Sequence, residues 1–377
     1  MGTDSKVSMK SVANRCGEDV MEKILIVGPS STKSKGVMST VIGEILEDNE
    51  LKNKYDISAY ESYIDGTKFR VLLYSIWAIF KFIVTGQAKK YDVYHIHAAS
   101  YGSTFRKRIY LKIIKKYKKK VILHIHGAEY MVFFDKLSKK KKRQVIDTLQ
   151  VADMVIALSN EWKNKFDNKF GLTNCYVLEN GINTEKLAPA IVDTKKNQTS
   201  FVTLGRLGKR KGTYDLVDAI EIARKKVPNI RCYLAGDGEI DKFCNIIVER
   251  GLQNNIEVVG WADFTKKLEL LSKVSTVVLP SYNEGLPMSI LEGMATGKAI
   301  ISTTVGAIPE VVKEENGILI QPGDVQALAD ALVKCSTNLK MLEDMSQKNI
   351  NKIYEQFSMK SMHLKLMSYY KQVIKNG

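Results

Sequence analysis

From Met21 onward, short runs rich in β-branched and aromatic residues alternate with longer segments of helical periodicity, and the alternation occurs in two successive series. The first series predicts strands at Lys23–Val27, Tyr55–Tyr60, Tyr91–His97, Lys120–His126, Met154–Leu158 and Cys175–Leu178. The second series predicts strands at Phe201–Leu204, Arg231–Leu234, Ile256–Val259, Thr276–Leu279, Ala299–Ser302 and Ile318–Ile320. Strands that alternate with helices form βαβ units with parallel sheets. The pattern therefore predicts an α/β protein with two Rossmann-like units in tandem.

The break between the two series indicates where the domains divide. Periodicity is lost between residues 180 and 200, a polar segment that contains Pro189, and a linker is expected there. We expect residues 1–20 to be an extension outside the fold, 21–185 to form the first domain and 186–356 the second. Residues 357–377 are predicted to form a terminal helix. A chain of 377 residues is long enough for two domains that each bury a core.

The net charge of +16 is concentrated in the first half of the chain. Residues 1–190 hold 32 Lys and Arg against 20 Asp and Glu, and residues 106–143 hold 15 basic residues with two acids, Glu129 and Asp135. Such a segment attracts nucleic acid or an anionic membrane surface, and it can also be a set of solvated basic helices. Because the chain has no RNP or zinc-finger module, nucleic acid is not expected as a partner.

The sequence shows neither a membrane span nor a secretion signal. Its most apolar run, Val71–Val84, has fourteen residues and contains Lys81, whereas a transmembrane helix needs about 20 apolar residues. We interpret this run as an amphipathic or buried helix. The first twenty residues lack the apolar core of a signal peptide, and the five cysteines form no CxxC pair, which is typical of a reducing compartment. The expected location is the cytoplasm.

The stretch 280–297, PSYNEGLPMSILEGMATG, places two carboxylates eight residues apart around a predicted helix start. Pro287 suits the first turn of a helix, where its missing N–H needs no partner. Glu284 then lies in the preceding loop and Glu292 lies on the helix. The first amides of the helix, from Leu286, Met288 and Ser289, are expected to form an anion site aided by the helix dipole.

A carboxylate on each side of an anion site suits a nucleotide sugar, because a diphosphate joins its two hydroxyl-bearing rings. Taken singly, each glutamate has a plainer interpretation. A glutamate before a helix complements the helix dipole, and a glutamate on a helix is usually solvated.

Three further segments follow predicted strands of the second series. In LGRLGKRKG, residues 204–212, the spacing of Arg206 and Lys211 lets two cations converge on one phosphate. LAGDGE, residues 234–239, and VGW, residues 259–261, end two other strands, and ligands of open α/β sheets bind beyond the carboxyl ends of strands. The first loop, GPSSTKSKG at 28–36, matches neither GxGxxG nor GxxxxGK[ST], so it is neither a dinucleotide fingerprint nor a P-loop.

Four of the five histidines lie in two HIH repeats, each at the end of a predicted strand. Because side chains alternate along a strand, His95 points the same way as His97, and His124 the same way as His126. If the two strands are neighbours, the four imidazoles meet, either as buried structural histidines or as a metal site. His126, at the end of its strand, is best placed to reach a cleft between the domains.

Several motifs together resemble those of the retaining glycosyltransferases of family 4, which have the GT-B fold. The motifs are GRLGKRKG, AGDGE, the glutamate pair in NEGLPMSILEGMATG, VGAIPEVV at 305–312, NGILIQPGD at 316–324 and HIHGAEY at 124–130. The resemblance runs from Met21 to the C-terminus. It implies two Rossmann-like domains that face each other across a cleft, with the last helix crossing back to the N-terminal domain.

The resemblance also implies functions for the matched residues. Glu284 would contact the donor hexose and Glu292 the ribose, while Arg206 and Lys211 would neutralise the diphosphate leaving group. His126 would approach the sugar and the acceptor, so that the implied catalytic residues are His126, Glu284, Arg206 and Lys211. The other implied donor-binding residues are Gly36, Gly205, Gly236, Trp261, Gly285, Leu286, Pro287 and Met288, with Trp261 near the base. His97 and Glu129 are expected on the acceptor side.

The function implied is transfer of a hexose-type sugar, with retention, from a nucleoside-diphosphate sugar to a hydroxyl of a lipid-linked or growing cell-surface glycan such as capsule, exopolysaccharide or lipopolysaccharide. Residues 106–143 would contact an anionic membrane, which would make the protein peripheral on the inner face of the cytoplasmic membrane. The chain contains no D-x-D, and Arg206 with Lys211 can replace a divalent ion, so neither a metal nor a cofactor is expected. The alternatives are a nucleotide-sugar epimerase and an inactive glycosyltransferase-like scaffold.

Overall fold

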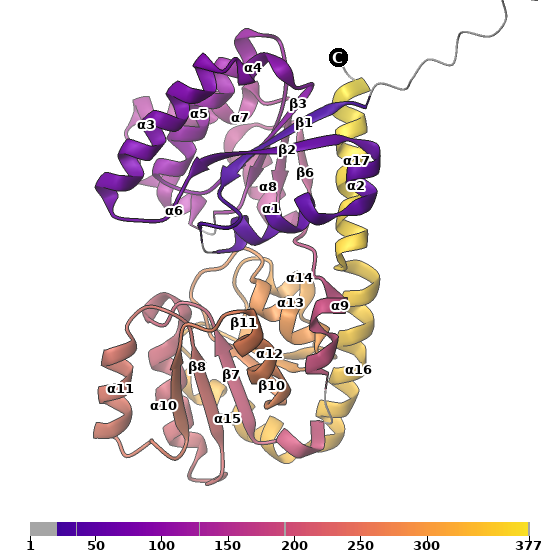
Figure 1. The fold of residues 1–377 in the computed structure, drawn as a ribbon. Helices are drawn as coiled ribbons and strands as arrows, with labels where there is room; N and C mark the ends of the chain where they lie inside the picture. The colour runs from indigo at the N-terminus through magenta and orange to yellow at the C-terminus, as the bar shows by residue number, and fades with distance from the viewer. Residues whose placement is uncertain (1–20, 35, 128, 192–193, 376–377) are drawn as a thin grey trace, which may run out of the picture.

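The computed structural model describes residues 21–34, 36–127, 129–191 and 194–375, and these residues form two α/β domains stacked end to end (Figure 1). The predicted extension, residues 1–20, lies outside the described residues. Each domain contains a six-stranded parallel sheet, and every strand predicted from the sequence is present, with each end within three residues of the predicted one. The two-unit α/β prediction is confirmed.

The N-terminal sheet has the strand order β2-β1-β3-β4-β5-β6. Its strands are β1 Lys23–Pro29, β2 Asp56–Tyr63, β3 Val93–Ala98, β4 Lys120–Ile125, β5 Met154–Ala157 and β6 Cys175–Val177. The helices are α1 Val37–Glu47, α2 Asn49–Lys54, α3 Lys68–Val84, α4 Gln87–Lys90, α5 Gly102–Lys116, α6 Tyr130–Asp135, α7 Lys139–Val151 and α8 Asn160–Phe170. Because helices cover both faces, β1 is apolar on both sides: Leu25 and Val27 enter one core, and Ile24 and Ile26 enter the other.

The C-terminal sheet has the order β12-β11-β10-β7-β8-β9. Its strands are β7 Ser200–Leu204, β8 Arg231–Ala235, β9 Ile256–Gly260, β10 Thr276–Leu279, β11 Ala299–Thr303 and β12 Gly317–Ile320. Its helices are α9 Thr184–Leu187, α10 Thr213–Ala223, α11 Ile240–Glu249, α12 Phe264–Ser272, α13 Met288–Ala295, α14 Ile308–Val311, α15 Val325–Thr337 and α16 Leu339–Gln356. The region predicted as a linker contains α9 and short 3₁₀ turns.

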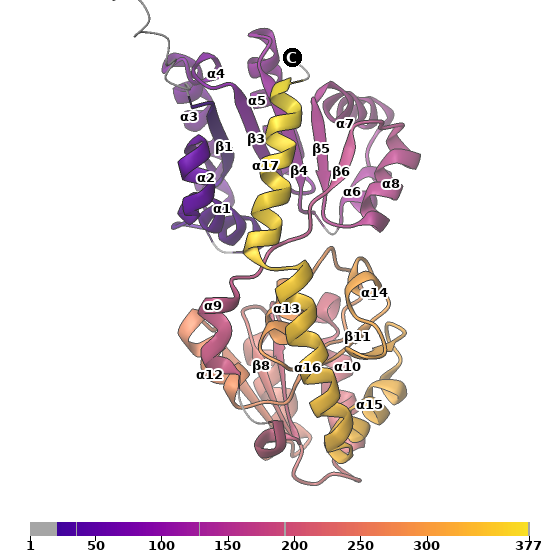
Figure 2. The ribbon, with the colours of Figure 1, turned by 90° about the vertical axis from the view of Figure 1, so that its right-hand side faces the viewer.

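The last helix, α17 Met359–Lys375, crosses from the C-terminal domain to the N-terminal one (Figure 2). Leu366 and Tyr370 are buried in the same core as Ile24 and Ile26 of β1. The hydroxyl of Tyr369 donates to the carbonyl of Val177 at 2.6 Å. The predicted return of the terminal helix is thus confirmed, and α17 fixes one domain relative to the other.

A further contact between the domains is a helix cap. Glu310 of α14 accepts hydrogen bonds from the backbone N–H groups of Asn160 and Glu161, at 3.1 and 2.7 Å. These two residues begin α8 of the N-terminal domain, where amides without an intrahelical partner and the helix dipole favour a carboxylate. The C-terminal domain therefore holds the N-terminal one by a charge-assisted contact as well as by α17.

Candidate active site

A cavity of about 990 Å³ lies between the two domains, and both domains supply its lining. The structure brings nearly all of the predicted site residues to it: Gly36, His126, Gly205, Arg206, Lys211, Gly236, Trp261, Glu284, Gly285, Leu286, Pro287, Met288 and Glu292. In the described chain, His97 and Glu129 are not among the lining residues. His97 is fully buried behind His126, and Glu129 accepts a hydrogen bond from the Tyr101 hydroxyl at 3.2 Å. Their acceptor-side function stays a prediction.

The carboxylate of Glu284 is held by a lysine from another element. Lys211, in a 3₁₀ turn after β7, places its Nζ 2.6 Å from the Glu284 Oε1, and both side chains are largely buried, 14% and 7% exposed. Burying a charge is costly unless it is paired, so each partner offsets the cost of burying the other and holds it in place. The pair places a cation and an anion side by side at the edge of the cavity.

The two arginines of the same loop differ in their surroundings. Arg206, which the sequence predicts to converge with Lys211 on a phosphate, has a side chain that is 72% exposed, and its Nη1 lies 3.7 Å from Asp237. Arg210 was not predicted as a site residue. Its Nη1 donates to the carbonyl of Asn283 at 3.0 Å and lies 3.8 Å from Glu284. The loop thus gives the cavity three cations, two of them beside Glu284.

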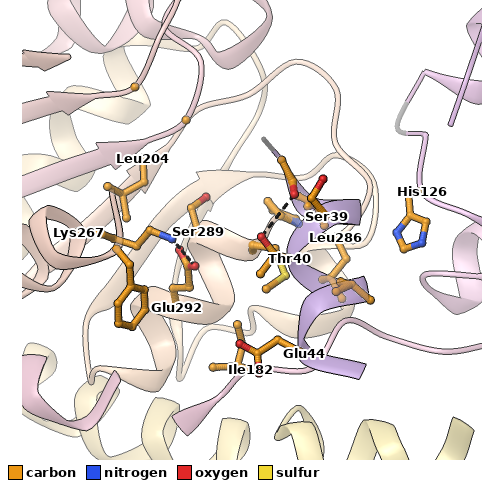
Figure 3. A pocket seen from close by; sticks show the side chains of 18 of the residues that line it. Ser39, Thr40, Glu44, His126, Ile182, Leu204, Lys267, Leu286, Ser289 and Glu292 are labelled. Atoms are coloured by element: carbon orange, nitrogen blue, oxygen red, sulfur yellow. Dashed lines mark hydrogen bonds and ion pairs between the residues drawn. The ribbon is translucent and has the colours of Figure 1, made fainter. Parts of the chain in front are cut away.

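The second carboxylate, Glu292, is also paired with a lysine that the sequence did not indicate. Lys267 of α12 places its Nζ 2.6 Å from the Glu292 Oε1, and the Glu292 side chain is 12% exposed. Figure 3 shows Lys267 extending to Glu292 inside the cavity. Burial raises the pKa of Glu292, and Lys267 opposes that shift. A buried carboxylate so placed can accept hydrogen bonds from ligand hydroxyls.

Between the two carboxylates lies the N-terminus of α13. The helix begins at Met288, and Pro287 is its N-cap, one residue later than the sequence predicted. Leu286, Pro287, Met288 and Ser289 all line the cavity. The first amides of a helix have no intrahelical acceptor, so the predicted anion site lies between Glu284 and Glu292.

A second helix N-terminus faces the cavity from the N-terminal domain. Gly36 is the N-cap of α1, and its φ of 116° is a conformation that favours glycine. A Cβ at this position would meet nothing within 4 Å, so the glycine serves the backbone turn and the space above it is open to a ligand. Ser39, Thr40 and Glu44 of α1 also line the cavity (Figure 3).

His126 approaches the cavity from the end of β4, across from Glu292 (Figure 3). Its Nε2 lies 2.9 Å from the Nδ1 of His97, and its Nδ1 is among the buried atoms without a partner in the described chain. Burial lowers the pKa of His126 to about 3, so the imidazole is neutral at neutral pH. A neutral imidazole that His97 holds in place can donate a hydrogen bond to a ligand hydroxyl or accept one from it.

The four imidazoles of the HIH repeats do meet, as the sequence predicted, because β3 and β4 are neighbours with His97 beside His124. The Nδ1 of His95 shares a hydrogen bond with the hydroxyl of Tyr370 at 2.9 Å, and its Nε2 lies 3.3 Å from the Nδ1 of His124. His95, His97 and His124 each offer a nitrogen within 4.8 Å of the others. The rings of His95 and His124 stack with planes 5° apart, an arrangement that suits packing.

The buried imidazoles predict a loss of stability in mild acid. Burial lowers the pKa of His95 and His126 from 6.5 to about 3 and lowers those of His97 and His124 well below 6.5. The unfolded chain binds protons below pH 6.5 and the folded chain does not, so the free energy of unfolding falls as pH falls through that value. Each imidazole contributes up to about 1.4 kcal/mol per pH unit. Urea unfolding between neutral pH and about pH 5 measures the slope; a flat profile would contradict neutral burial.

Two family models match the chain in adjoining segments. Residues 46–186 match the model described as Glycosyltransferase Family 4, and residues 184–352 match the model described as Glycosyl transferases group 1. The UDP-Gal:alpha-D-GlcNAc-diphosphoundecaprenol alpha-1,3-galactosyltransferase of Escherichia coli is 27% identical over 314 residues, covering 76% of this chain and 77% of the relative. The amylovoran biosynthesis glycosyltransferase AmsK of Erwinia amylovora is 23% identical, covering 65% of this chain and 61% of the relative.

Solved structures share the two-domain architecture. HepE from Anabaena, solved with UDP and glucose, superposes with a TM-score of 0.72 at 17% identity, covering 93% of this chain and all of HepE. Sucrose-phosphate synthase from Thermosynechococcus elongatus superposes with a TM-score of 0.74 at 16% identity, covering 94% of this chain and all of that chain. At these identities the likeness concerns the fold.

Proposed function

This chain belongs to the group 1 glycosyltransferases and has the GT-B fold, and from that premise we propose that it moves a hexose from a UDP-sugar, with retention, to a lipid-linked glycan. The observation that carries the proposal is the arrangement around the N-terminus of α13. Glu284 with Lys211 lies on one side, Glu292 with Lys267 on the other, and His126 faces them from the opposite domain. Glu284 suits the hexose of a nucleotide sugar, the α13 amides with Lys211 suit the diphosphate, and Glu292 suits the ribose.

The names of two related proteins support the choice of substrates. The E. coli relative is named for UDP-galactose and a diphosphoundecaprenol-linked acceptor, and HepE was solved with UDP and glucose. We therefore choose UDP as the donor nucleotide and a polyprenyl-diphosphate-linked sugar as the acceptor class. The basic segment 106–143 would lie against the anionic inner face of the cytoplasmic membrane, where such acceptors are found, so the protein would act there as a peripheral enzyme.

Loss of UDP builds negative charge on the diphosphate, and fixed cations aimed at that charge lower the barrier. In the proposed reaction Lys211, Arg206, Arg210 and the α13 amides supply this stabilisation. The C–O bond to the diphosphate breaks and the acceptor oxygen bonds to the same face of the anomeric carbon, while the leaving phosphate takes the acceptor proton. Because protein cations carry the charge, we propose that no metal or cofactor is needed, and we expect EDTA to leave the initial rate unchanged within about twofold.

A donor screen followed by an anomer assignment tests the function. Thermal shifts with UDP-, GDP- and ADP-hexoses should single out a UDP-sugar, because ligand that binds the native state raises the melting temperature. The best donor is then incubated with a lipid-diphosphate-linked N-acetylglucosamine, and proton NMR of the first product should show the α-anomer formed from the α-donor. Conversion of the donor without acceptor would instead indicate an epimerase, and tight donor binding without transfer to any acceptor would indicate a scaffold.

A further inference from the structure

Helix α3 presents large apolar side chains to solvent along its whole length. The exposed residues follow one another at spacings of one and three, which places them on one continuous face of the helix. Each is at least half exposed: Phe69, Leu72, Leu73, Ile76, Trp77, Phe80, Ile83 and Val84. Figure 1 shows α3 at the outer edge of the N-terminal domain, on the side away from α17.

The inward face of α3 combines small residues with larger apolar ones, and Ile79 packs against the core from this side. Ser75 and Ala78 are buried against the domain together with Phe82, whose ring packs on Tyr110 of α5 at 5.0 Å. The helix is therefore anchored by one apolar side, while a second face of large apolar residues is exposed to water. Soluble proteins rarely leave a contiguous apolar face of this size uncovered, and such faces mark interaction sites.

The charged residues of α3 and of the following helix, α4, are all basic. Between Asp65 and Asp92 the sequence contains five basic residues and no acid. The basic residues are Lys68, Arg70, Lys81, Lys89 and Lys90. The Nζ of Lys81 lies 5.0 Å from the centre of the Trp77 ring, so this cation packs on an aromatic side chain of the apolar face. Exposed Lys112 and Lys116 of the neighbouring α5 extend the positive rim.

We propose that α3 is a membrane-docking helix that inserts its apolar face into the surface of an anionic phospholipid bilayer. An amphipathic helix with aromatic and aliphatic residues on one face and a basic rim lies in the plane of such a surface, with its apolar side at the boundary between headgroups and acyl chains. Within the described chain, no helix combines the length and hydropathy that a membrane span requires, so α3 would lie on the bilayer. A second copy of the chain fits this face poorly, because a symmetric pair would bring two basic rims together.

The α3 face would make a large part of the membrane contact that is proposed for residues 106–143. The basic segment 106–143 was expected to make it by charge alone, yet several of its cations are already engaged within the protein. Lys107 is buried and donates to the Ser62 hydroxyl, and Lys115 pairs with Asp153 at 2.7 Å. The apolar face of α3 adds an attraction to that of the exposed cations such as Lys112 and Lys116, and it does so independently of the donor chemistry proposed above.

Co-sedimentation with vesicles tests the proposal. Wild-type protein should bind vesicles of phosphatidylcholine with phosphatidylglycerol, and bind them less as salt rises. The double variant Ile76→Ser/Phe80→Ser should lose about tenfold or more of this binding, because both side chains lie on the inserted face. The matched control Val248→Ser/Tyr354→Ser removes apolar residues that are equally exposed on α11 and α16 and should bind as wild type does.

Fluorescence reports insertion directly. Vesicles should shift the emission of the wild-type protein to shorter wavelength, and Trp77→Phe should abolish that shift. Equal vesicle binding by wild type and Ile76→Ser/Phe80→Ser, or no vesicle binding by wild type, would overturn the proposal. A dimer that light scattering detects in wild type and not in the double variant would assign the face to a second copy instead. Thermal shifts with UDP-sugar should be the same in all these variants, which separates failure of this proposal from failure of the catalytic one.

Discussion

Replacing Lys211 by alanine is expected to lower the turnover number by about 10²–10³-fold. The variant loses the cation that we place at the departing diphosphate, and it leaves the carboxylate of Glu284 buried without its 2.6 Å partner. Both consequences act at the reacting end of the donor. Initial rates at saturating donor and acceptor measure the effect, and a melting curve shows whether the variant remains folded.

The neighbouring Lys209 provides a matched control. It lies in the same 3₁₀ turn and is exposed, and it is not among the residues that line the cavity in the described chain. Lys209→Ala should therefore retain wild-type turnover within about twofold, since exposed charges away from a site contribute little. A Lys211→Ala enzyme that turns over as fast as Lys209→Ala would remove Lys211 from the mechanism.

The alternating pattern of the sequence was sufficient to predict both sheets, for a physical reason. Strands covered on both faces must be apolar throughout, as β1 and β5 are, and the loops between them must turn at Gly, Pro or short polar segments. These requirements are local, so they leave a local signal. The crossing of α17 came from the family resemblance, since the burial of Tyr370 against β1 depends on contacts between residues more than 300 positions apart.

The candidate site was predicted only where its residues lie in contiguous motifs. Glu284, Glu292 and Lys211 are in such motifs. Lys267 is not, because α12 brings it to Glu292 from a helix whose sequence, FTKKLELLS, has the pattern of an ordinary surface helix. Arg210 was passed over because the same loop offers four cations, and only the fold shows which of them face Glu284.

The orientation of α3 could not be predicted from periodicity either. The run Val71–Val84 was interpreted as an amphipathic or buried helix, and an amphipathic helix of a soluble domain ordinarily buries its apolar side. In the structure, Ser75, Ala78 and Phe82 face the core, and the Phe82 ring packs on Tyr110 of α5. A periodic pattern indicates that two faces differ, and it does not indicate which face the domain covers.

The two carboxylates beside α13 should respond differently to removal. Glu292→Ala is expected to weaken binding of UDP and of UDP-hexose alike, by about 10–100-fold, which is the loss of hydrogen bonds between a carboxylate and ligand hydroxyls. The ribose is present in both ligands, so the fold-loss of affinity should be the same for UDP and for UDP-hexose. Isothermal titration with the two ligands measures it, and exposed Glu315→Ala is the control that should leave both affinities unchanged.

Glu284→Ala should instead leave the affinity for UDP within about threefold, because UDP lacks the hexose that this carboxylate is placed to contact and the Lys211 cation remains for the diphosphate. The substitution should instead lower the turnover number and weaken the preference between epimeric UDP-hexoses. A carboxylate that accepts a hydrogen bond from one hydroxyl of the hexose discriminates against the epimer in which that hydroxyl points elsewhere. The ratio of the UDP-hexose to the UDP affinity is therefore the quantity that separates the two glutamates. If both variants change this ratio equally, the assignment of hexose to one end of α13 and ribose to the other is wrong.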